Sequence, residues 1–554
     1  MSAAIQPKLD TPFSTHEVFN QPQPLPAYNA WDSDVPLREA VRVNGGDWAQ
    51  AQLSAHGAMS GGEQMELGEL ANRNKPVLHA FDRYGRRIDE VQFHPAYHQL
   101  MLNAMRGEVH SFSWNHSGQP GAHVVRAALL YLNGQADAGT CCPLTMTHAA
   151  IPALLNTPEL AKIWIPKLTA RDYDPRPLPV EQKRACTIGM GMTEKQGGSD
   201  VRSNTTQAHP QADGSFKLVG HKFFFSAPMC DAHLVLAQLD GRVSCFLMPR
   251  ILPDGSLNAV RIQRLKDKLG DWSNASSEVE FQGATAYLVG AEGRGVATIL
   301  EMVALTRLDC VIASSALMRQ ALVQALNHVS QRHAFGHVLI EQPLMRNVLA
   351  DLALESEAAV AFTMRIARAV DASPNDPQEA AFARIATAIG KYWICKRTPA
   401  FVNEAQECLG GIGFVEENIL PRLYRQAPLN SIWEGSGNVQ CLDVLRSLHK
   451  DPAVSEALFA ELQSAAGLHP LYDSHLQWLH NAFQDIGNLE ARSRLVVERT
   501  ALAIQAGLLL KSGNNEIADI FCRARLGNEC GFAFGSLDSN APLSTLIERA
   551  MPRL

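Results

Sequence analysis

A segment rich in glycine and hydroxyl side chains, Met192-Thr-Glu-Lys-Gln-Gly-Gly-Ser-Asp200, offers the clearest chemistry in the sequence. Gly197 and Gly198 allow the backbone to approach a flat ligand without interference from a Cβ atom. Thr193 and Ser199 can each donate and accept a hydrogen bond. The segment therefore predicts a binding loop for a flat, polar-edged ligand. A plain surface turn is the alternative, because Gly, Ser and Asp are the commonest turn residues.

Two later segments carry similar chemistry, Glu407-Cys-Leu-Gly410-Gly411-Ile-Gly413-Phe414 and Asn430-Ser-Ile-Trp-Glu434-Gly-Ser-Gly-Asn438. Pro421-Arg422-Leu-Tyr-Arg425 lies between them. The second segment places one carboxylate, Glu434, beside a tryptophan, and a carboxylate in an apolar site is suited to removing a proton from carbon. A carboxylate that caps a helix or sits in a loop is the alternative for Glu434.

These motifs, in this order, resemble the acyl-CoA dehydrogenase family. The pattern is most similar to the family's alkylation-response branch, in residues 189–200, 264–270 and 431–438. The family architecture matches residues 90–446, and the long N-terminal arm and C-terminal extension fit the branch as well. The resemblance implies a mainly α fold with helical, β-barrel and four-helix-bundle domains, an appended C-terminal helical domain, and FAD as cofactor.

Hydrophobic periodicity independently predicts the same order of elements. Apolar residues recur at three- and four-residue spacing from about 95 to 165, and again after Gly290. Between 184 and 290 the period is two, with turns at Asp213-Gly214 and Asp240-Gly241. We expect an arm and helical domain at 1–183, a β domain at 184–290, a helical bundle at 291–448 and an appended helical domain at 449–554.

The resemblance also implies the cofactor contacts. Thr193 corresponds to the hydroxyl at the flavin pyrimidine edge, Phe224 to the aromatic residue that packs on the isoalloxazine ring, and Ser226 to the hydroxyl at its central ring. The remaining expected contacts within the chain are Met192, Gly198, Ser199, Trp433, Gly435, Ser436 and Asn438. Four residues would reach the FAD of a neighbouring copy: Arg332, Phe335, Gly410 and Gly411. The family therefore implies a homo-oligomer, with a dimer of dimers expected.

Glu434 fills the position of the family's catalytic base. Other family members carry the base just before the residue equivalent to Arg307, where this chain has Thr306. Arg307 and Ser199 are expected near the substrate. The family often has an aspartate where Ala304 stands, so the acyl-CoA tunnel is expected to differ.

Two main functions remain open at this stage, and nothing in the sequence decides a third, a flavin monooxygenase on the same fold. One is an ordinary FAD-dependent acyl-CoA dehydrogenase that passes electrons to an electron-transferring flavoprotein. The other, implied by the alkylation-response branch, is a flavoprotein that binds and protects double-stranded DNA, with weak dehydrogenase activity. DNA binding requires several cations on one surface. The candidates are Arg446, Lys450, Arg492, Arg494, Arg523 and Arg525, although the extension holds about as many acidic residues.

Composition limits the binding partners and the cellular compartment that we expect for this protein. The net charge of −7 gives the molecule as a whole no attraction for nucleic acid or anionic membrane. The eleven cysteines form no Cys-x-x-Cys pair, which favours buried thiols in a reducing compartment and a cytoplasmic location. Pro22, Pro24 and Pro26 indicate an ordered arm rather than a signal peptide, and no membrane span is expected. His94 and His98 are interpreted as structural, with no metal site.

Overall fold

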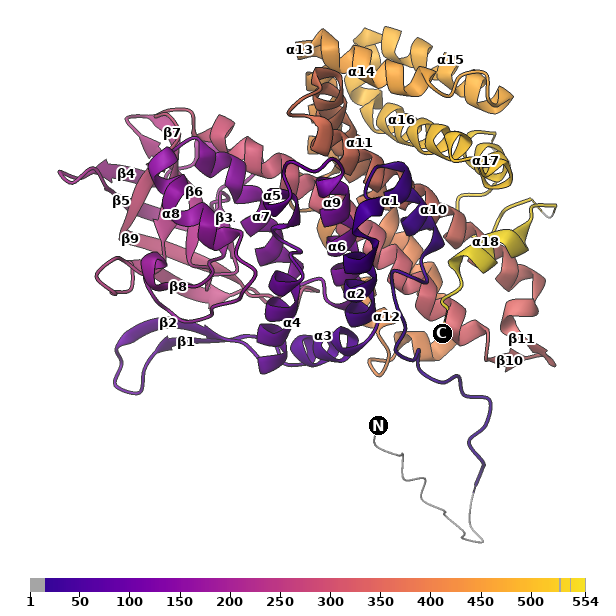
Figure 1. The fold of residues 1–554 in the computed structure, drawn as a ribbon, viewed down its shortest axis with the longest axis horizontal. Coiled ribbons are helices and arrows are strands. Elements are labelled where there is room, and N and C mark those ends of the chain that lie inside the picture. Colours follow the sequence, from indigo (N-terminus) through magenta and orange to yellow (C-terminus); the bar gives the residue numbers. More distant parts are fainter. Residues whose placement is uncertain (1–14, 528–529, 539, 554) are drawn as a thin grey trace.

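The computed structural model describes residues 15–527, 530–538 and 540–553, and most of its strands lie to one side of a central group of long helices (Figure 1). The first part of the described chain is mostly helical. Its elements are α1 (Val35–Val43), α2 (Gln50–Ser60), α3 (Glu63–Arg73), β1 (Val77–Phe81), β2 (Arg87–Gln92), α4 (Pro95–Arg106), α5 (Phe112–Asn115), α6 (Ala122–Ala136), α7 (Cys141–Leu155) and α8 (Pro158–Leu168).

The hairpin β1–β2 is a feature that helical periodicity did not predict. Residues of β1 alternate between exposed and intermediate, which is the pattern of a strand with one covered face. The two strands pair in antiparallel register from Val77 with Gln92, and β1 packs beside β8. The hairpin therefore joins the helical region to the β region.

The β region contains β3 (Ile188–Gly191), β4 (Gln207–Pro210), β5 (Phe216–Ser226), β6 (Ala232–Leu239), β7 (Arg242–Pro249), β8 (Val260–Leu265) and β9 (Ser276–Val289). Strands β6, β4, β5, β9 and β7 pair in that order, and β7 pairs again with β6, so the sheet closes on itself as a barrel. The turn between β6 and β7 consists of Asp240 and Gly241 with φ of 49° and 74°, as a two-residue hairpin requires.

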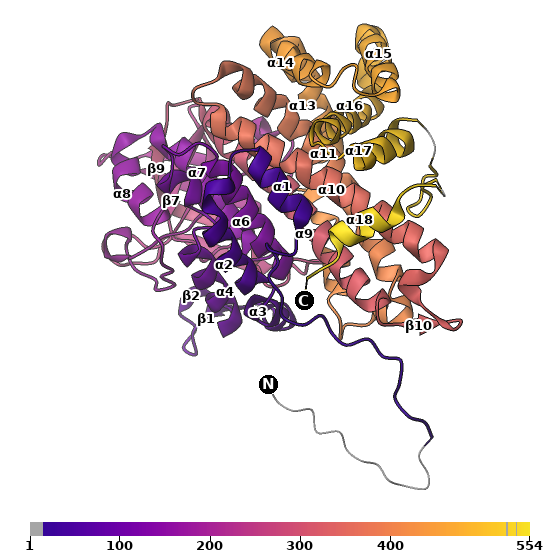
Figure 2. The same ribbon diagram turned by 45° about the vertical axis from the view of Figure 1, so that its right-hand side comes forward.

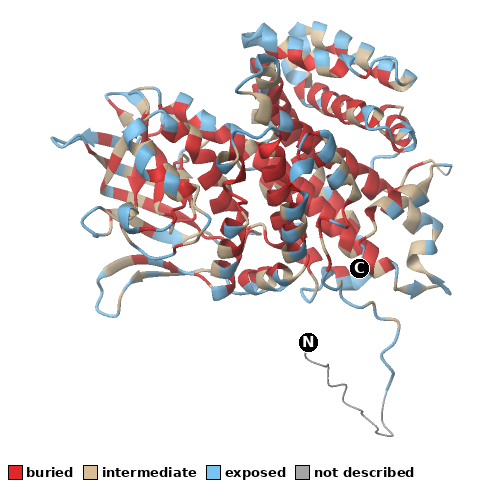
Figure 3. Ribbon diagram, viewed as in Figure 1, coloured by how far each residue is buried: buried red, intermediate tan, exposed pale blue. Residues whose placement is uncertain are grey.

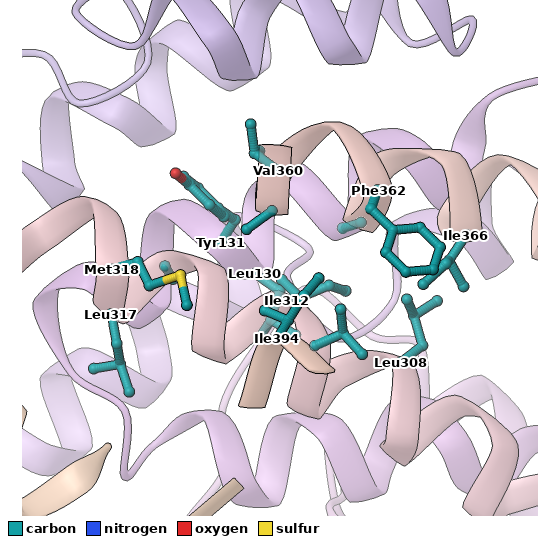
Figure 4. Close-up of a cluster of buried hydrophobic side chains, with 14 of the residues drawn as sticks. Leu130, Tyr131, Leu308, Ile312, Leu317, Met318, Val360, Phe362, Ile366 and Ile394 are labelled. Atoms are coloured by element: carbon teal, nitrogen blue, oxygen red, sulfur yellow. The ribbon is translucent and has the colours of Figure 1, made fainter. Parts of the chain in front are cut away.

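The helical bundle follows, with α9 (Gly295–Val329), β10 (His333–Ala334), β11 (His337–Val338), α10 (Pro343–Ala372), α11 (Pro377–Glu407), α12 (Leu420–Gln426) and α13 (Gly437–Lys450). Helix α9 packs against α6, α7, α10 and α11. Figure 4 shows the apolar side chains that fill this core: Leu130 and Tyr131 from α6, Leu308, Ile312, Leu317 and Met318 from α9, Val360, Phe362 and Ile366 from α10, and Ile394 from α11.

The chain ends in an appended helical layer composed of α14 (Pro452–Gln463), α15 (Pro470–Gln484), α16 (Leu489–Lys511), α17 (Asn515–Phe521) and α18 (Leu543–Ala550). Helix α16 packs on α10 and α11, and α18 packs on α10 and α1. Figure 2 shows α18 lying across the bundle near α1, so the first and last helices of the described chain pack on the same long helix, α10.

Burial is concentrated in the long central helices, whereas the appended layer exposes its outer faces (Figure 3). In the described residues no helix is both long and apolar enough to span a membrane. All eleven cysteines are free thiols, and only Cys530 is less than fully buried. The three boundaries between the four expected domains stay predictions.

Candidate active site

The loop Met192–Asp200 follows β3 and is anchored by one buried carboxylate. Glu194 accepts hydrogen bonds from Lys222 Nζ at 2.8 Å and from the Thr206 hydroxyl at 2.6 Å, and also from the Thr205 amide at 2.7 Å. Burial alone would raise the pKa of Glu194, but the Lys222 ammonium and these donors hold that pKa well below its usual range. Glu194 is therefore an ionised anchor for the loop and not a proton carrier.

Thr193 and Gly198 form the inner surface of this loop. The Thr193 carbonyl accepts a hydrogen bond from the Phe223 amide at 2.8 Å, which ties the loop to β5. A Cβ atom on Gly198 would lie 2.4 Å from Thr193 Oγ1. Only glycine therefore permits this packing, and it leaves the Thr193 hydroxyl at the edge of the loop.

Strand β5 presents the next two expected contacts. Its pairing with β9 shifts register between Lys222 and Phe225, which is the mark of a β-bulge. Phe225 is fully buried, whereas the Phe224 ring next to it is 53% exposed. The bulge therefore turns Phe225 into the barrel core and leaves Phe224 on the outer face, where Lys266 Nζ lies over its ring. Ser226 is half-buried, and its hydroxyl lies 3.2 Å from that of Ser276.

Glu434 occupies the short loop before α13 in a strained conformation. Its φ is 58°, in the left-handed region that a residue with a side chain rarely adopts. Two donors hold its carbonyl oxygen, Arg307 Nε at 3.0 Å and Gln440 Nε2 at 3.1 Å. Lys391 Nζ donates to the carbonyls of Trp433 and Gly435, both at 2.6 Å. The fold thus imposes the strain, as expected where a side chain must point in one direction.

The Glu434 carboxyl group is half-buried, and its one hydrogen-bond partner among the described residues is Thr306, whose hydroxyl donates to Oε2 at 2.7 Å. Burial raises the pKa of Glu434 above its ordinary value, opposed by the Thr306 hydrogen bond and by the positive charges of Lys391 and Arg307. A carboxylate with a raised pKa is a stronger base toward a C–H group. The arrangement therefore supplies a positioned proton acceptor.

Arg307 supports this loop rather than facing an open site. Besides holding the Glu434 carbonyl, its guanidinium donates to Asp443 Oδ2 at 2.7 Å, and Arg384 pairs with the same carboxylate at 2.7 Å. The side chain of Arg307 is only 13% exposed. Its expected substrate contact stays a prediction.

The two sides of the site meet at one apolar cluster. Met192 from the loop after β3 and Trp433 from the loop before α13 both pack against one cluster of buried residues, to which α7, β6 and α9 contribute. Trp433 Nε1 donates to Asn430 Oδ1 at 3.0 Å, which fixes the indole. The barrel motif and the Glu434 motif, remote in sequence, are therefore brought to the same region.

The residues expected to reach a neighbouring copy lie elsewhere on the surface. Phe335 is 96% exposed at the tip of the β10–β11 hairpin, and Arg332 directly precedes that hairpin. Gly410 and Gly411 are exposed, and an added Cβ atom on either would meet nothing within 4 Å. Within the described residues, no hydrogen bond, ion pair or ring contact joins either pair to this chain's own Glu434 loop.

The polar groups of the site suit a ligand such as FAD. Within the described residues, the hydroxyls of Thr193, Ser199 and Ser436 and the amide of Asn438 make no hydrogen bond. Phe224 and the half-buried Trp433 present aromatic surface, and Gly435 has a φ of 97°. Free donors beside exposed aromatic rings match the polar edge and flat face of an isoalloxazine.

Six cations were predicted to contact DNA, and for Arg525 the structure contradicts this prediction. Its side chain is 10% exposed and pairs with Asp351 and with Glu355, the latter at 3.0 Å, both on α10. The ion pair attaches the appended layer to the bundle and offers no charge to a partner. Desolvating a guanidinium is tolerated here because two carboxylates compensate it.

The other five cations are at least partly accessible. Arg492 pairs with Asp485 at 2.6 Å, and Arg494 donates to the Tyr392 hydroxyl at 3.3 Å. Arg523 lies 3.5 Å from Asp538, and Arg446 lies 3.8 Å from Asp443. Lys450 is exposed at the end of α13. Acidic neighbours thus accompany three of the five, so they do not form a patch of positive charge alone.

The two histidines interpreted as structural both have structural partners. His94 Nδ1 accepts the Ala96 amide at 3.2 Å and so caps α4. His98 Nδ1 lies 2.9 Å from the Tyr173 hydroxyl. Each of the two histidines thus has a structural contact through its Nδ1 atom.

Comparison with known proteins decides the family. Family models match residues 20–175 as the adaptive response protein AidB N-terminal domain, 189–284 as the acyl-CoA dehydrogenase middle domain, and 293–449 as the acyl-CoA dehydrogenase C-terminal domain. AidB of Escherichia coli (strain K12) is 48% identical over 521 residues, which cover 94% of this chain and 96% of that protein. The chain belongs to the acyl-CoA dehydrogenase family.

Further relatives agree with this assignment. Acyl-CoA dehydrogenase family member 11 of Caenorhabditis elegans is 30% identical over 513 residues, covering 89% of this chain and 80% of that protein. The crystal structure of Caenorhabditis elegans ACDH-11 in complex with C11-CoA superposes with a TM-score of 0.85 and 26% identity, covering 93% and 94% of the two chains. The chain is thus an AidB-like acyl-CoA dehydrogenase family member, in a family of FAD-dependent oxidoreductases that act on CH–CH bonds.

Sequence reasoning missed the residues that hold the acyl-CoA dehydrogenase motifs in place. Lys391 is the clearest case, because it lies inside the otherwise apolar run Ala388–Cys395 of α11. A single lysine in such a run signals a buried cation with a specific partner. Glu194 lies within the Met192–Asp200 motif, but its pairing with Lys222 depends on the barrel register.

A cleft of about 900 Å³ lies between α1, α10, α11, α14 and α16, and none of the expected cofactor residues lines it. Its walls carry paired charges such as Arg365 with Glu379 and Glu461. This cleft is separate from the acyl-CoA dehydrogenase motifs.

Proposed function

We propose that this protein desaturates an acyl-CoA thioester between Cα and Cβ, with Glu434 as the base. The observation that carries the proposal is the Glu434 carboxyl group itself. It has a raised pKa, one hydrogen bond from Thr306, and a strained backbone held by Arg307, Gln440 and Lys391. A purely structural loop carboxylate would not require a left-handed backbone fixed by three side chains.

The reaction breaks two C–H bonds of the substrate. The Glu434 carboxylate accepts the α-proton, and the bonding pair left on Cα forms the new double bond with Cβ as a hydride leaves Cβ. When bound, FAD supplies the acceptor for that hydride. Lys391 and Arg307, fixed at the backbone of the loop, keep the carboxylate aimed at one place, so the geometry is set before substrate enters.

Acyl-CoA binding is supported by the relative that was solved with C11-CoA. Ser199, whose hydroxyl is free among the described residues, is proposed to contact the thioester arm, and Arg307 lies one helical turn beyond Ala304 on α9. Alanine at that position removes the carboxylate that many family members have there. We infer a tunnel with altered contacts to the acyl thioester.

Exposed apolar groups support a homo-oligomer with shared cofactor sites. Phe335, Leu344 and Phe414 are 96%, 82% and 83% exposed. Large side chains left so open on one chain favour a partner surface. We propose that Arg332, Phe335, Gly410 and Gly411 complete the FAD site of a second copy, in a dimer of dimers. An electron-transferring flavoprotein is the proposed acceptor of the electrons.

A second candidate function follows from the AidB affiliation. The match to the adaptive response protein AidB favours a role in the response to DNA alkylation, with binding and protection of double-stranded DNA and weak dehydrogenase activity. The proposed contacts are Arg446, Lys450, Arg492, Arg494 and Arg523. Because most of them have acidic neighbours, we expect weak, backbone-directed binding that declines steeply with salt.

An anaerobic titration with acyl-CoAs tests the main proposal. We expect saturated short and branched acyl-CoAs to bleach the oxidised flavin of the wild-type protein. The Glu434→Gln variant should retain FAD but lose about 10³-fold in the rate of bleaching. Glu417→Gln, which neutralises an exposed carboxylate, is the matched control and should bleach at the wild-type rate. Equal rates in wild type and Glu434→Gln would refute the role of Glu434.

If no acyl-CoA bleaches a fully bound flavin, the second candidate takes precedence. DNA binding would then be measured by fluorescence anisotropy on duplexes between 50 and 200 mM salt, roughly the range over which phosphate contacts weaken most visibly. Affinity that is absent, or flat across this range, would exclude the DNA role.

A further inference from the structure

The β10–β11 hairpin is too small and too strained to hold its position alone. It pairs only His333 with Val338 and Ala334 with His337. Its turn consists of Phe335 and Gly336, with φ of 53° and 82°. An isolated hairpin is at best marginally stable, and a left-handed phenylalanine makes it less so. Something outside the hairpin must stabilise it.

The N-terminal arm supplies that contact through Asn20. The Asn20 side-chain amide donates to the His333 carbonyl at 2.9 Å, and its Oδ1 accepts the His333 amide at 2.8 Å. The two bonds satisfy the edge of β10 as a third strand would. The Asn20 carbonyl accepts a hydrogen bond from Arg332 Nη1, which orients the guanidinium. One residue of the arm thus fixes both the backbone of the hairpin and the cation before it.

The arm itself is fixed along the end of α9. The Gln23 amide donates to Gln331 Oε1 at 2.9 Å, and the Gln23 carbonyl accepts Asn327 Nδ2 at 3.0 Å. Asn20 has a φ of 54°, a conformation that asparagine tolerates better than other residues with a side chain. The residue type therefore suits both the backbone conformation and the two-point contact.

We propose that Asn20 is a positioning residue for the Arg332–Phe335 hairpin, so that the N-terminal arm of one copy sets the FAD affinity of the site that this hairpin completes in a second copy. The inference rests on the proposed oligomeric FAD site. The inference goes beyond that site because it assigns a function to the N-terminal arm. Asn20 lies 313 positions from His333 in the sequence.

The test replaces Asn20 with glycine, which keeps the left-handed backbone accessible and removes only the amide. The FAD dissociation constant of the full-length protein is measured by flavin fluorescence, with oligomeric state by light scattering and the thermal midpoint of the FAD-free protein. We expect FAD to bind about tenfold more weakly, as loss of two hydrogen bonds implies, with the FAD-free midpoint unchanged. Asn20→Asp, which keeps the acceptor and loses the donor, should give a smaller loss.

Two further variants make the result specific. Gln23→Ala is the matched control, because the arm residue Gln23 makes its contacts through its backbone, and it should bind FAD as the wild type does. Arg332→Ala should weaken FAD binding at least as much as Asn20→Gly. If Arg332→Ala weakens binding but Asn20→Gly does not, the role of Asn20 is refuted and the proposed FAD site stands. If Arg332→Ala has no effect either, the proposed contact with a second copy's FAD fails, and the inference with it.

Discussion

The hydroxyl of Thr306 on α9 donates a 2.7 Å hydrogen bond to the carboxylate of Glu434, 128 positions away. The same hydroxyl lies 3.1 Å from the Val303 carbonyl of its own helix. A hydroxyl has one proton, so it can serve either the carboxylate or the helix carbonyl. Ionised Glu434 competes for that proton more strongly than protonated Glu434, because charge-assisted hydrogen bonds are the stronger ones. Thr306 therefore favours the basic form of Glu434.

Removing this hydroxyl should move the pH dependence of flavin reduction. Burial already raises the pKa of Glu434, and Thr306→Val removes the hydrogen bond that opposes the rise. The acid limb of the rate profile should move to higher pH, with about a tenfold slower rate on that limb and little change on the alkaline plateau. Stopped-flow reduction by a saturating acyl-CoA between pH 5 and 9 measures it. Thr306→Ser should have the wild-type profile. Identical profiles for Thr306→Val and the wild type would show that the Thr306 hydrogen bond does not affect the pKa of Glu434.

Lys391 should matter for both stability and base strength. Lys391→Met leaves the Trp433 and Gly435 carbonyls without their donor and removes a charge that lowers the pKa of Glu434. We expect a loss of about 2–4 kcal/mol in the free energy of unfolding, and an acid limb at higher pH. Lys396→Met, at an exposed position on the same helix, is the control. Urea unfolding and the pH profile separate the two effects, and an unchanged profile would limit Lys391 to a structural role.

The order of helical and β regions could be predicted from periodicity, because the change from spacing of three and four to spacing of two is local information. The turns at Asp213-Gly214 and Asp240-Gly241 were equally local, and Gly214, Asp240 and Gly241 all have positive φ. Phe225 and Phe224 could not be told apart, because the bulge that separates them arises from pairing with β9. The β1–β2 hairpin was missed because its strands, Val77–Phe81 and Arg87–Gln92, do not alternate apolar and polar residues in the sequence.

The motifs located the site but not its supports. Glu434, Thr193 and Ser199 stand out by residue type in a Gly-rich setting. The contacts of Lys391, Arg307 and Asn20 depend on helices and an arm that pack together only in the folded chain. Arg525 was predicted to be available to DNA, because the sequence does not show that it is buried in ion pairs with Asp351 and Glu355. Long-range ion pairs are a property of the tertiary structure.

Two glycine substitutions should distinguish contacts within the chain from contacts with a second copy. Gly198→Ala places a Cβ atom 2.4 Å from Thr193 Oγ1, so it should displace the loop and weaken FAD binding about tenfold or more. Gly411→Ala meets nothing within 4 Å in the chain. If Gly411 approaches the FAD of a second copy, Gly411→Ala should also weaken FAD binding while leaving the FAD-free thermal midpoint unchanged. Gly118→Ala, equally open, is the control, and a Gly411→Ala variant that matches it would argue against the shared site.

Buried neutral histidines predict a loss of stability in mild acid. Both ring nitrogens of His56 lack a protein partner among the described residues, and burial lowers the pKa of His56 to about 4. Burial likewise lowers the pKa of His110 and of His233 to about 3. The unfolded chain, with a histidine pKa of about 6.5, binds protons that the folded chain refuses. Stability should therefore fall as pH drops through 6.5 and continue to fall until the folded-state pKa is reached.

Replacing one of these histidines should remove its share of that loss. Between pH 7 and pH 5, His56 alone should lower the free energy of unfolding by about 2 kcal/mol. His56→Leu should therefore unfold at nearly the same urea concentration at both pH values once the remaining histidines are accounted for, and should be at least as stable as wild type at pH 7, since no hydrogen bond is lost. The control is His449→Leu on the exposed end of α13, which should keep the wild-type pH dependence. If His56→Leu loses as much stability as wild type between these pH values, His56 accepts a proton within the folded protein and its burial is not what makes the fold sensitive to acid.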